Sequence, residues 1–525
     1  MRIELIGAQS KNQPAAAVVG AKAANLARVA ALGLPVPPAF VLPIEICEAV
    51  ANCDPAGRQQ LVKGLAEGME FLERATGKRF GDRRRPLLVS VRSGAARSMP
   101  GMLDTVLDVG CTPAALHGLI RMSGNPRFAF DCRRRFLESF GGVALGVPPA
   151  AFKSRLHEVI AAEAAASERE LDSEALERLG ASYQRAIEHD CGALAETAME
   201  QLQAAAEAVY RSWMSDRAVT YRRLQHFDDL RGTAVMVQAM VFGNDGPSSG
   251  AGVAFSRDPS TGVSTPVIDI MFQSQGEDIV SGTHTPDSEA AIERVLPDVA
   301  GQLRDALERL EYAFADVQDV EFTIEDGKLW ILQTRAVKRS PQAALRFAID
   351  FVESGRISPS EALLRLQDVD LDKLVRSRLI DVDRPVARGT GACAGIAVGR
   401  AAFDTASADR IAAAGNPIIL VRPDTSTADV AAFAVSSGIV TAAGGRTAHA
   451  ALVARQMDKP CIVGCADLAV DAAAHCARLG AATLKEGDWL SIDGDAGTIY
   501  LGRGTVVSER PEPELAEVAR WRKAA

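Results

Sequence analysis

Residues 444–451 read GGRTAHAA, and an alanine-rich stretch continues to Met457. This pattern predicts a glycine turn followed by a helix that begins near His449. A ring at that position lies near partly positive backbone N–H groups, which favour an anion over an imidazolium. The imidazole is then neutral and nucleophilic, and its phosphorylated form is stabilised. A structural histidine at a helix end is the alternative, and spacing alone leaves both interpretations open.

The sequence around His449 is typical of a small β/α domain, because small residues, short strands and short helices alternate over residues 389–505. The whole chain has 525 residues, so about two to four domains are expected. The predicted fold class is multidomain, α/β and α+β. Within it we expect a helical region over 112–227, a helical linker over 339–388 with a hinge near 375–388, and a polar tail over 506–525.

A second segment, residues 316–335, reads DVQDVEFTIEDGKLWILQTR and predicts a β-hairpin. A two-residue Asp-Gly turn would put Glu321 and Gln333 on opposite faces of the hairpin. A three-residue loop with Gly327 in a left-handed conformation would instead gather the polar side chains on one face. We predict this odd-length loop because it leaves the other face almost wholly apolar. The gathered set is Asp319, Glu321, Gln333 and Arg335.

These side chains suit phosphoryl transfer. The oxygens of Glu321 and Gln333 are of the kind that Mg²⁺ prefers, and Arg335 suits a phosphate group. An exposed amphipathic hairpin without a site is the alternative.

Three further positions are weaker candidates. Arg92 ends a strand before a loop of small residues (SVRSGAARSMPGM, residues 90–102), which suits a mobile cover over polyphosphate, although such loops are often simply solvated. Lys22 falls two residues after Gly20 in a first helical turn, where a cation is unfavourable unless it has an anion partner. Glu277 lies in the segment QGED (275–278), which could bind adenosine or form an ordinary turn.

Composition and charge indicate which ligands and which cellular surroundings to expect for this chain. The formal net charge is −9, from 58 basic and 67 acidic residues, so no broad attraction to nucleic acid is expected. We expect neither a signal peptide at the N-terminus nor a membrane-spanning run. The nine cysteines contain no Cys-x-x-Cys pair, which favours free thiols in a reducing cytoplasm.

Together these segments resemble the pyruvate, phosphate dikinase family. The resemblance is carried by KAANLA (22–27), LGLPVPP (32–38), residues 87–107, residues 232–262 with VAFSRDP (253–259), and residues 318–339. Residues 444–464, including KPC (459–461), are similar to the swivelling phosphohistidine domain of that family. The RSGA and SMPGM sequences around Arg92 favour the dikinase branch over phosphoenolpyruvate synthase and rifampicin phosphotransferase, whose version is acidic.

The resemblance implies an ATP-grasp-like nucleotide-binding domain over residues 1–338 with a helical insertion, followed by the swivelling domain. In such an enzyme His449 would attack the β-phosphate of ATP to give pyrophosphohistidine and AMP, and phosphate would then remove the terminal phosphoryl group as pyrophosphate. Thr447 matches a position that plant members phosphorylate for control. By the same resemblance, Mg²⁺ would be held by Glu321 and Gln333, and the phosphates of ATP would be bound by Lys22, Arg92 and Arg335 with support from Asp319.

Some features depart from the family pattern. Ala21 and Ala23 stand where the family has glycines, and His284 stands where it usually has an arginine. The pyruvate-binding barrel of the family has no counterpart before Ala525. We therefore expect a separate barrel subunit or another phosphoryl acceptor as partner, and neither nucleic acid nor membrane. The alternatives are a non-catalytic, regulatory nucleotide-binding protein and transfer to another acceptor.

Overall fold

The computed structural model describes residues 1–525 apart from 8–11, 98, 100–101, 281–284, 425–428, 447, 472–473 and 525. The chain forms two compact units. The first contains Met1–Pro247, Ile324–Asp326 and Trp330–Thr334, and the second contains Ser248–Thr323, Gly327–Leu329 and Arg335–Ala525. No helix among the described residues is long and apolar enough to cross a membrane.

The first unit is built on an antiparallel five-stranded sheet. Its central strand, β7, has all seven residues buried, which explains its apolar sequence TAVMVQA. In spatial order the strands are β1 (Glu4–Ile6), β2 (Ala39–Leu42), β7 (Thr233–Ala239), β5 (Val89–Ala95) and β6 (Thr105–Val109). Strands β3 (Arg79–Phe80) and β4 (Pro86–Leu87) pair with each other in a separate two-stranded sheet.

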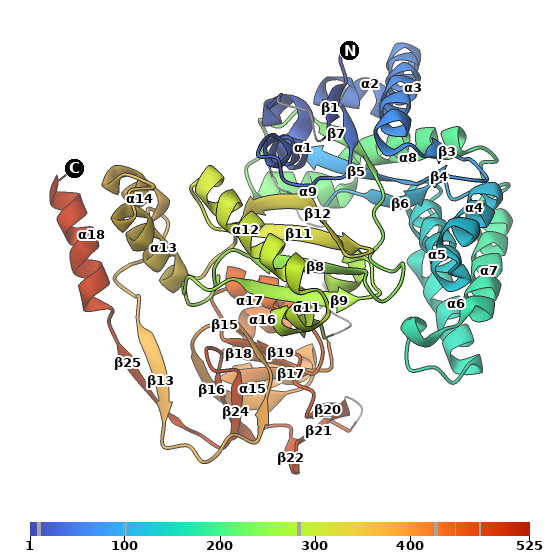
Figure 1. Cartoon of the computed structure of the whole chain (residues 1–525). Coiled ribbons are helices and arrows are strands. Elements are labelled where there is room, and N and C mark those ends of the chain that lie inside the picture. Colours follow the sequence, from blue (N-terminus) through green and yellow to red (C-terminus); the bar gives the residue numbers. More distant parts are fainter. Residues whose placement is uncertain are drawn as a thin grey trace. The chain divides into compact units, whose positions relative to one another are not determined.

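Helices supply most of the rest of the first unit (Figure 1). Several begin with a side-chain cap; in α8, for example, Thr197 and Glu200 form a reciprocal capping box. Residues 112–227, where a helical region is expected, contain the helices α4 to α9. The helices are α1 (Ala16–Ala31), α2 (Cys47–Ala51), α3 (Pro55–Thr76), α4 (Pro113–Ser123), α5 (Pro126–Val143), α6 (Pro149–Ala162), α7 (Ser173–Cys191), α8 (Ala198–Arg211) and α9 (Asp216–Leu224).

A second five-stranded sheet contains the predicted hairpin. Two helices that precede the hairpin in the chain, α11 (Glu289–Val295) and α12 (Pro297–Phe314), are separated at Leu296, because Pro297 lacks an N–H donor and disfavours a helical residue before it. Residues 276–280 form α10 (Gly276–Val280). The strand order is β10 (Asp287–Ser288), β9 (Val267–Phe272), β8 (Gly250–Phe255), β11 (Gln318–Glu325) and β12 (Lys328–Ala336).

The hairpin loop differs from the prediction. Strands β11 and β12 leave only Asp326 and Gly327 as the turn, with φ of 46° and 70°, so the predicted three-residue loop is wrong. Positive φ at both positions is typical of the type I′ turn that Asp-Gly favours. The register at the far end is nevertheless shifted by one residue, because the N–H of Val337 donates to the carbonyl of Val317 at 3.0 Å. A two-residue turn followed by uninterrupted pairing would set Val317 opposite Ala336.

The helical linker expected over 339–388 contains α13 (Pro341–Glu353), α14 (Pro359–Arg365) and β13 (Arg376–Ile380). The expected polar tail instead forms β25 (Thr505–Glu509), which pairs with β13, and α18 (Glu512–Ala524). In α18, Val518 and Trp521 lie three residues apart and are buried in a core shared with α13 and α14. The tail therefore folds because a tertiary partner covers two apolar side chains that are too few to suggest a helix on their own.

The domain that contains His449 is a β/α fold around an eight-stranded sheet. Four of its strands are parallel neighbours, in the order β16, β17, β18 and β19, joined by α15 (Thr405–Ala413), α16 (Val430–Val435) and α17 (His449–Gln456). The full order is β14 (Ala387–Arg388), β24 (Thr498–Leu501), β23 (Trp489–Asp493), β16 (Ile396–Ala402), β17 (Ile418–Arg422), β18 (Gly438–Thr441), β19 (Cys461–Val463) and β15 (Thr390–Cys393). A small sheet contains β20 (Leu468–Asp471), β21 (Cys476–Leu479) and β22 (Ala482–Lys485).

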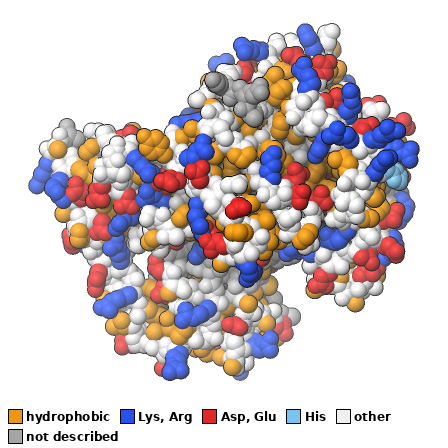
Figure 2. Space-filling view, in the orientation of Figure 1, with side chains coloured by type: hydrophobic (Ala, Val, Ile, Leu, Met, Phe, Trp, Pro, Cys, Tyr) orange, Lys and Arg blue, Asp and Glu red, His pale blue; other side chains and the backbone are white. Residues whose placement is uncertain are grey.

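Charged side chains are mixed on the face drawn in Figure 2, where basic and acidic groups alternate over short distances. This mixing agrees with a modest net charge of −9 and gives no broad basic surface on that face.

Candidate functional site

The predicted phosphoryl carrier lies at the carboxyl end of a parallel strand. Strand β18 ends at Thr441, and the backbone places His449 at the first position of α17. Between them Gly444 has φ of 107°, a conformation that glycine adopts readily. Ala448 precedes the helix and offers no side-chain cap. The carboxyl ends of parallel strands and uncapped helix N-termini are both common places for phosphate groups.

The loop before His449 is held by buried polar groups within the second unit. The N–H of Arg446 donates to Asp269 Oδ2 at 2.9 Å, and Arg446 Nε donates to the carbonyl of Gly391 at 3.0 Å. Arg455 of α17 is 4% exposed and donates to the carbonyl oxygens of Arg446 and Ala392. Burial lowers the pKa of Arg455. The backbone that leads into α17 is therefore tightly specified.

Asp269 was not singled out from the sequence. The available signal was a lone carboxylate in β9, whose residues VIDIMF are otherwise apolar and largely buried. A buried charge in such a strand requires a partner, but the sequence does not show that the partner is a backbone N–H 177 residues away.

Asp319 and Arg335 form the best-defined part of the predicted polar face. Arg335 Nε donates to Asp319 Oδ2 at 2.8 Å, and Asp319 is 5% exposed. Burial raises the pKa of Asp319, against the opposing effect of Arg335, and the nearby charge of Glu321 raises it further. For Arg335, burial lowers the pKa but Asp319 and Glu321 more than offset this, so its pKa is raised overall. The structure thus brings Asp319, Glu321 and Arg335 together.

The oxygen donors of the hairpin fit a magnesium ion. Asp319 Oδ1 is buried without a hydrogen-bond partner among the described residues, beside the carboxylate of Glu321. Gln333 of β12 carries an amide and is 4% exposed. Mg²⁺ binds through one or two carboxylates and takes its other ligands from water and substrate phosphates, so a small donor set suffices. Among the residues that the structure describes, no cluster of three or more His, Cys, Asp or Glu side chains could hold a metal ion.

Lys22 lies just after a bend in α1. Gly20 has φ of 80° and ψ of 157°, and a Cβ there would lie 2.1 Å from the carbonyl oxygen of Gly94 in β5. Lys22 is therefore in the first turn of the regular helix that follows, as predicted. Arg92 lies on β5 two residues before Gly94, and its Nη1 donates to Gln238 Oε1 at 3.4 Å. The close approach of α1 and β5 thus brings the elements that carry Lys22 and Arg92 together.

The remaining predicted positions are less informative. Glu277 is partly buried in the short helix α10, where the Asp278 carboxylate accepts a hydrogen bond from the N–H of Gln275. Thr447 and His284 lie outside the described residues.

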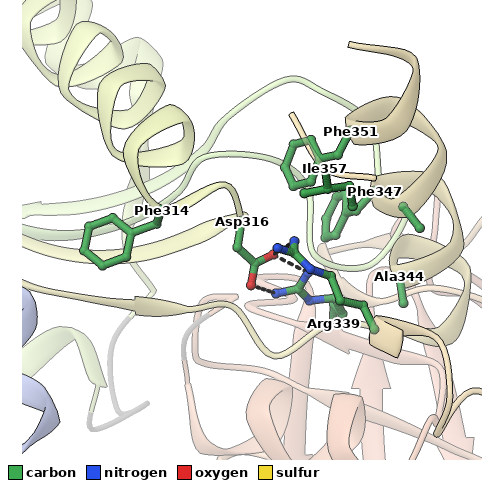
Figure 3. Close-up of a pocket in the computed structure, with 9 residues that line it drawn as sticks. Phe314, Asp316, Arg339, Ala344, Phe347, Phe351 and Ile357 are labelled. Carbon is green, nitrogen blue, oxygen red and sulfur yellow. Dashed lines mark hydrogen bonds and ion pairs between the residues drawn. The ribbon is translucent and has the colours of Figure 1, made fainter. Parts of the chain in front are cut away.

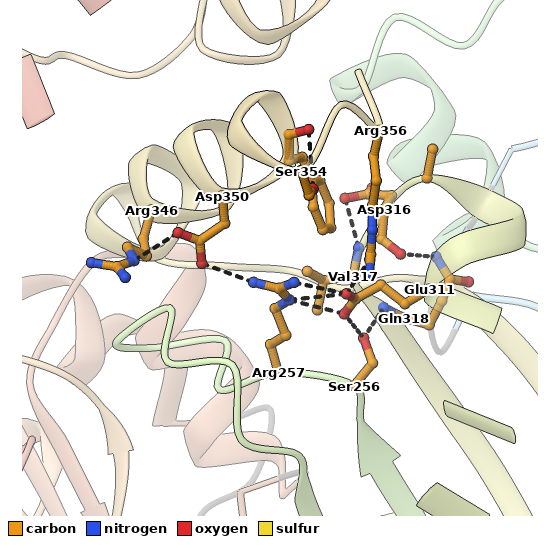
Figure 4. Close-up of polar contacts among 12 residues, drawn as sticks. Ser256, Arg257, Glu311, Asp316, Val317, Gln318, Arg346, Asp350, Ser354 and Arg356 are labelled. Carbon is orange, nitrogen blue, oxygen red and sulfur yellow. Dashed lines mark hydrogen bonds and ion pairs between the residues drawn. The ribbon is translucent and has the colours of Figure 1, made fainter. Parts of the chain in front are cut away.

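A buried ion-pair network supports the start of β11 (Figure 4). Arg257, from the VAFSRDP segment, pairs with Glu311 of α12 at 2.9 Å and with Asp350 of α13 at 2.9 Å. Ser256 Oγ donates to Glu311 and accepts from the N–H of Gln318, the residue before Asp319. The VAFSRDP segment thus fixes the strand that carries the polar face.

A cavity of about 380 Å³ lies beside α13 and is lined by none of the predicted site residues (Figure 3). Arg339 and Asp316 point toward each other there and are joined by two hydrogen bonds of 2.7 and 2.9 Å. Its walls are otherwise mainly Phe314, Phe347, Phe351 and Ile357.

Two protein-family models match parts of this chain. Residues 56–297 and 288–354 match the family described as Pyruvate phosphate dikinase, AMP/ATP-binding domain. Residues 415–497 match the family described as PEP-utilising enzyme, mobile domain. The first match covers every predicted nucleotide-site residue except Lys22, and the second covers His449.

Curated relatives match over nearly the whole chain. Pyruvate, phosphate dikinase 1, chloroplastic, of Arabidopsis thaliana is 37% identical over 523 residues, 99% of this chain and 54% of the relative. Pyruvate, phosphate dikinase of Clostridium symbiosum is 38% identical over 491 residues, 92% of this chain and 56% of the relative. The Rhizobium meliloti protein of the same name is 38% identical over 522 residues, covering 97% and 58%. The chain spans about half the length of the curated relatives that it matches.

Proposed function

The chain belongs to the pyruvate, phosphate dikinase family, and on that premise we propose that it is an ATP-dependent phosphotransferase that carries a phosphoryl group on His449. The observation that carries the proposal is the position of His449 at the start of α17, after the carboxyl end of β18, in the part of the chain that matches the mobile domain. A helix N-terminus stabilises added negative charge, as a phosphohistidine requires.

The nucleotide side of the proposal assigns each predicted residue a role. Lys22, Arg92 and Arg335 bind phosphate oxygens, and Glu277 contributes to the nucleotide site. Asp319 holds Arg335 in place through the 2.8 Å ion pair, so that the guanidinium keeps one orientation toward a phosphate. The match to an AMP/ATP-binding domain supports ATP as the nucleotide.

Glu321 and Gln333 would hold Mg²⁺, with Asp319 beside them. When bound, the ion neutralises phosphate charge during transfer. The protein residues orient the phosphates. Burial raises the pKa of Asp319, and the neighbouring guanidinium of Arg335 opposes this effect.

The proposed reaction has two balanced steps. In the first, a ring nitrogen of His449 bonds to the β-phosphorus of ATP, the bond from that phosphorus to the α–β bridging oxygen breaks, and AMP leaves. In the second, an oxygen of inorganic phosphate bonds to the terminal phosphorus of the pyrophosphohistidine, the bond from that phosphorus to the bridging oxygen breaks, and pyrophosphate leaves. The chain is left with one phosphoryl group on His449.

We propose pyruvate as the final acceptor, bound to a separate barrel partner, because the relatives are named for pyruvate and phosphate. Swivelling of the domain over residues 389–505 would bring His449 to that partner. The acceptor is tested by a chase: pyruvate alone should leave the label on the chain, and addition of the pyruvate-binding barrel of a family member should move it to phosphoenolpyruvate. Retention of the label with the barrel present would rule out this acceptor.

The kinase itself is tested in a single turnover. Purified chain, Mg²⁺, phosphate and a stoichiometric amount of ATP should give AMP, pyrophosphate and acid-labile protein phosphate in equal amounts. His449→Ala should give none of the three. Binding of ATP without AMP release by the wild type would leave only a nucleotide-binding protein.

A further inference from the structure

Helix α1 is almost wholly apolar apart from one polar face. Its polar side chains are those of Lys22, Asn25 and Arg28, each three residues from the next. Residues three apart are neighbours on a helix surface, so these side chains lie along one face. Asparagine is a weaker helix former than alanine, which dominates the rest of α1. Asn25 therefore requires an explanation other than helix formation.

The side chain of Asn25 binds a strand that is distant in sequence. Its Nδ2 donates to the carbonyl oxygen of Thr334 in β12 at 2.9 Å, across 309 residues, in a partly buried position. A second hydrogen bond joins the same two segments, from the N–H of Ile331 to the carbonyl of Pro35 at 2.8 Å. Both bonds lie within the first compact unit. Strand β12 is thus fixed to α1 and to the loop after it.

The Asn25 bond connects two parts of the proposed site. Lys22 lies one turn before Asn25 on the same face of α1, and Gln333 immediately precedes Thr334. Thr334 is 1% exposed, so its carbonyl has no access to bulk water as a substitute for the amide.

We infer that Asn25 is a positioning residue for the phosphoryl-transfer site: its amide holds β12 against α1, so that Gln333 keeps its place relative to Lys22. This inference rests on the function proposed above and gives a role to Asn25, to which the KAANLA segment alone assigned none. Small displacements of groups that bind a reacting phosphate lower rates strongly, because the transition state requires close alignment.

The test compares the same substitution, asparagine to aspartate, at two positions in the chain. Asn25→Asp keeps the shape of the side chain but replaces the donating amide with a carboxylate that faces a carbonyl oxygen. Asn12→Asp is the matched control, because Asn12 Nδ2 donates to Glu4 Oε2 at 2.6 Å in an exposed position. At saturating ATP, we expect the first-order rate constant of phosphohistidine formation to fall about 10- to 100-fold in Asn25→Asp and to stay within about twofold in Asn12→Asp.

The rate constant separates positioning from mere destabilisation. Partial unfolding lowers the amount of labelled protein but leaves the rate constant of the folded fraction unchanged. Asn25→Ala, which removes the amide without adding a charge, should lower the rate constant in the same direction. If both Asn25 variants give less labelled protein but an unchanged rate constant, the inference would be overturned.

A double variant tests the link to Lys22. If Asn25 acts by keeping Lys22 and Gln333 aligned, then Asn25→Asp should slow a Lys22→Met chain much less than it slows the wild type. If the rate reductions of the two single variants multiply in the double variant, the two residues act independently, and this result would overturn the inference. An unlabelled wild type would refute the proposed function itself, whereas a labelled wild type with an unaffected Asn25→Asp would refute only the role of Asn25.

Discussion

Asp319 Oδ2 lies 2.8 Å from Arg335 Nε on the neighbouring strand, although the two strands are joined by a two-residue turn. Unbroken pairing from that turn would set Asp319 opposite Thr334. The hydrogen bond from the N–H of Val337 to the carbonyl of Val317 shows that the register has moved by one residue between the turn and these two residues. This shift places a carboxylate and a guanidinium on the same face.

Phosphohistidine formation should require the planar guanidinium of Arg335, which a lysine cannot replace. Arg335→Lys keeps the charge but loses the Nε–H that donates to Asp319, so the cation is no longer held in one orientation. We expect phosphohistidine formation to slow by about 10- to 100-fold. Arg309→Lys, which alters an exposed pair with Asp305 on α12, is the control and should leave the rate unchanged. Equal rates in wild type and Arg335→Lys would argue against a phosphate-binding role.

The ionisation of Asp319 should make stability depend on pH in a defined direction. Burial raises its native-state pKa above 3.8, so the native state keeps a proton that the unfolded chain has already lost. The free energy of unfolding should therefore decrease as the pH rises from 3.8 through the raised pKa. The measurement is the free energy of unfolding of the wild type minus that of Asp319→Asn as a function of pH, and this difference should decrease as the pH rises. A difference that is constant, or that grows with pH, would show that the pKa is not raised.

The bend at Gly20 should tolerate no side chain. Gly20 and Gly33 both have positive φ, but a Cβ at Gly20 would lie 2.1 Å from the Gly94 carbonyl oxygen, whereas one at Gly33 would meet nothing within 4 Å. Gly33→Ala should cost about 1–2 kcal/mol from backbone strain alone. Gly20→Ala should cost about 1–3 kcal/mol more from overlap. Urea unfolding of both variants measures the difference, and equal losses would mean that the close approach is not needed.

Glu311 should be essential to the fold of the second unit. It is 5% exposed and accepts hydrogen bonds from Arg257, Arg356 and Ser256. Glu311→Gln would remove the carboxylate that pairs with Arg356 and one of the two that pair with Arg257, and should cost about 3–5 kcal/mol of unfolding free energy. Glu308→Gln, an exposed position on the same helix, should stay within about 0.5 kcal/mol. A mild effect at Glu311 would mean that the network does not support β11.

Local patterns predicted a good part of the molecule. The glycine turn and the helix that begins at His449 follow from residues close together in sequence, as do the helices over 112–227. The polar face with Asp319 and Arg335 was also predicted, but through the wrong loop. The Asp-Gly pair specified a type I′ turn, and the shift that restored the face lies farther along the strands, where alternation alone gives no signal.

The missed features depend on distant partners. Asn25 and Asp269 each bind a backbone group, 309 and 177 residues away respectively, so nothing in their own segments identifies the partner. Helix α18 forms where two apolar residues, Val518 and Trp521, meet a core built by α13 and α14. Sequence periodicity cannot reveal such pairs, because they are set by tertiary packing.

The central claim is that ATP leaves its β-phosphoryl group on His449. The most direct measurement incubates the chain with Mg²⁺ and ATP labelled at either the β- or the γ-phosphorus, with and without inorganic phosphate, beside His449→Ala. The account predicts that both labels bind the wild type without phosphate, and that added phosphate releases the γ-label as pyrophosphate while the acid-labile β-label remains. Retention of only the γ-label, or equal labelling of His449→Ala, would contradict it.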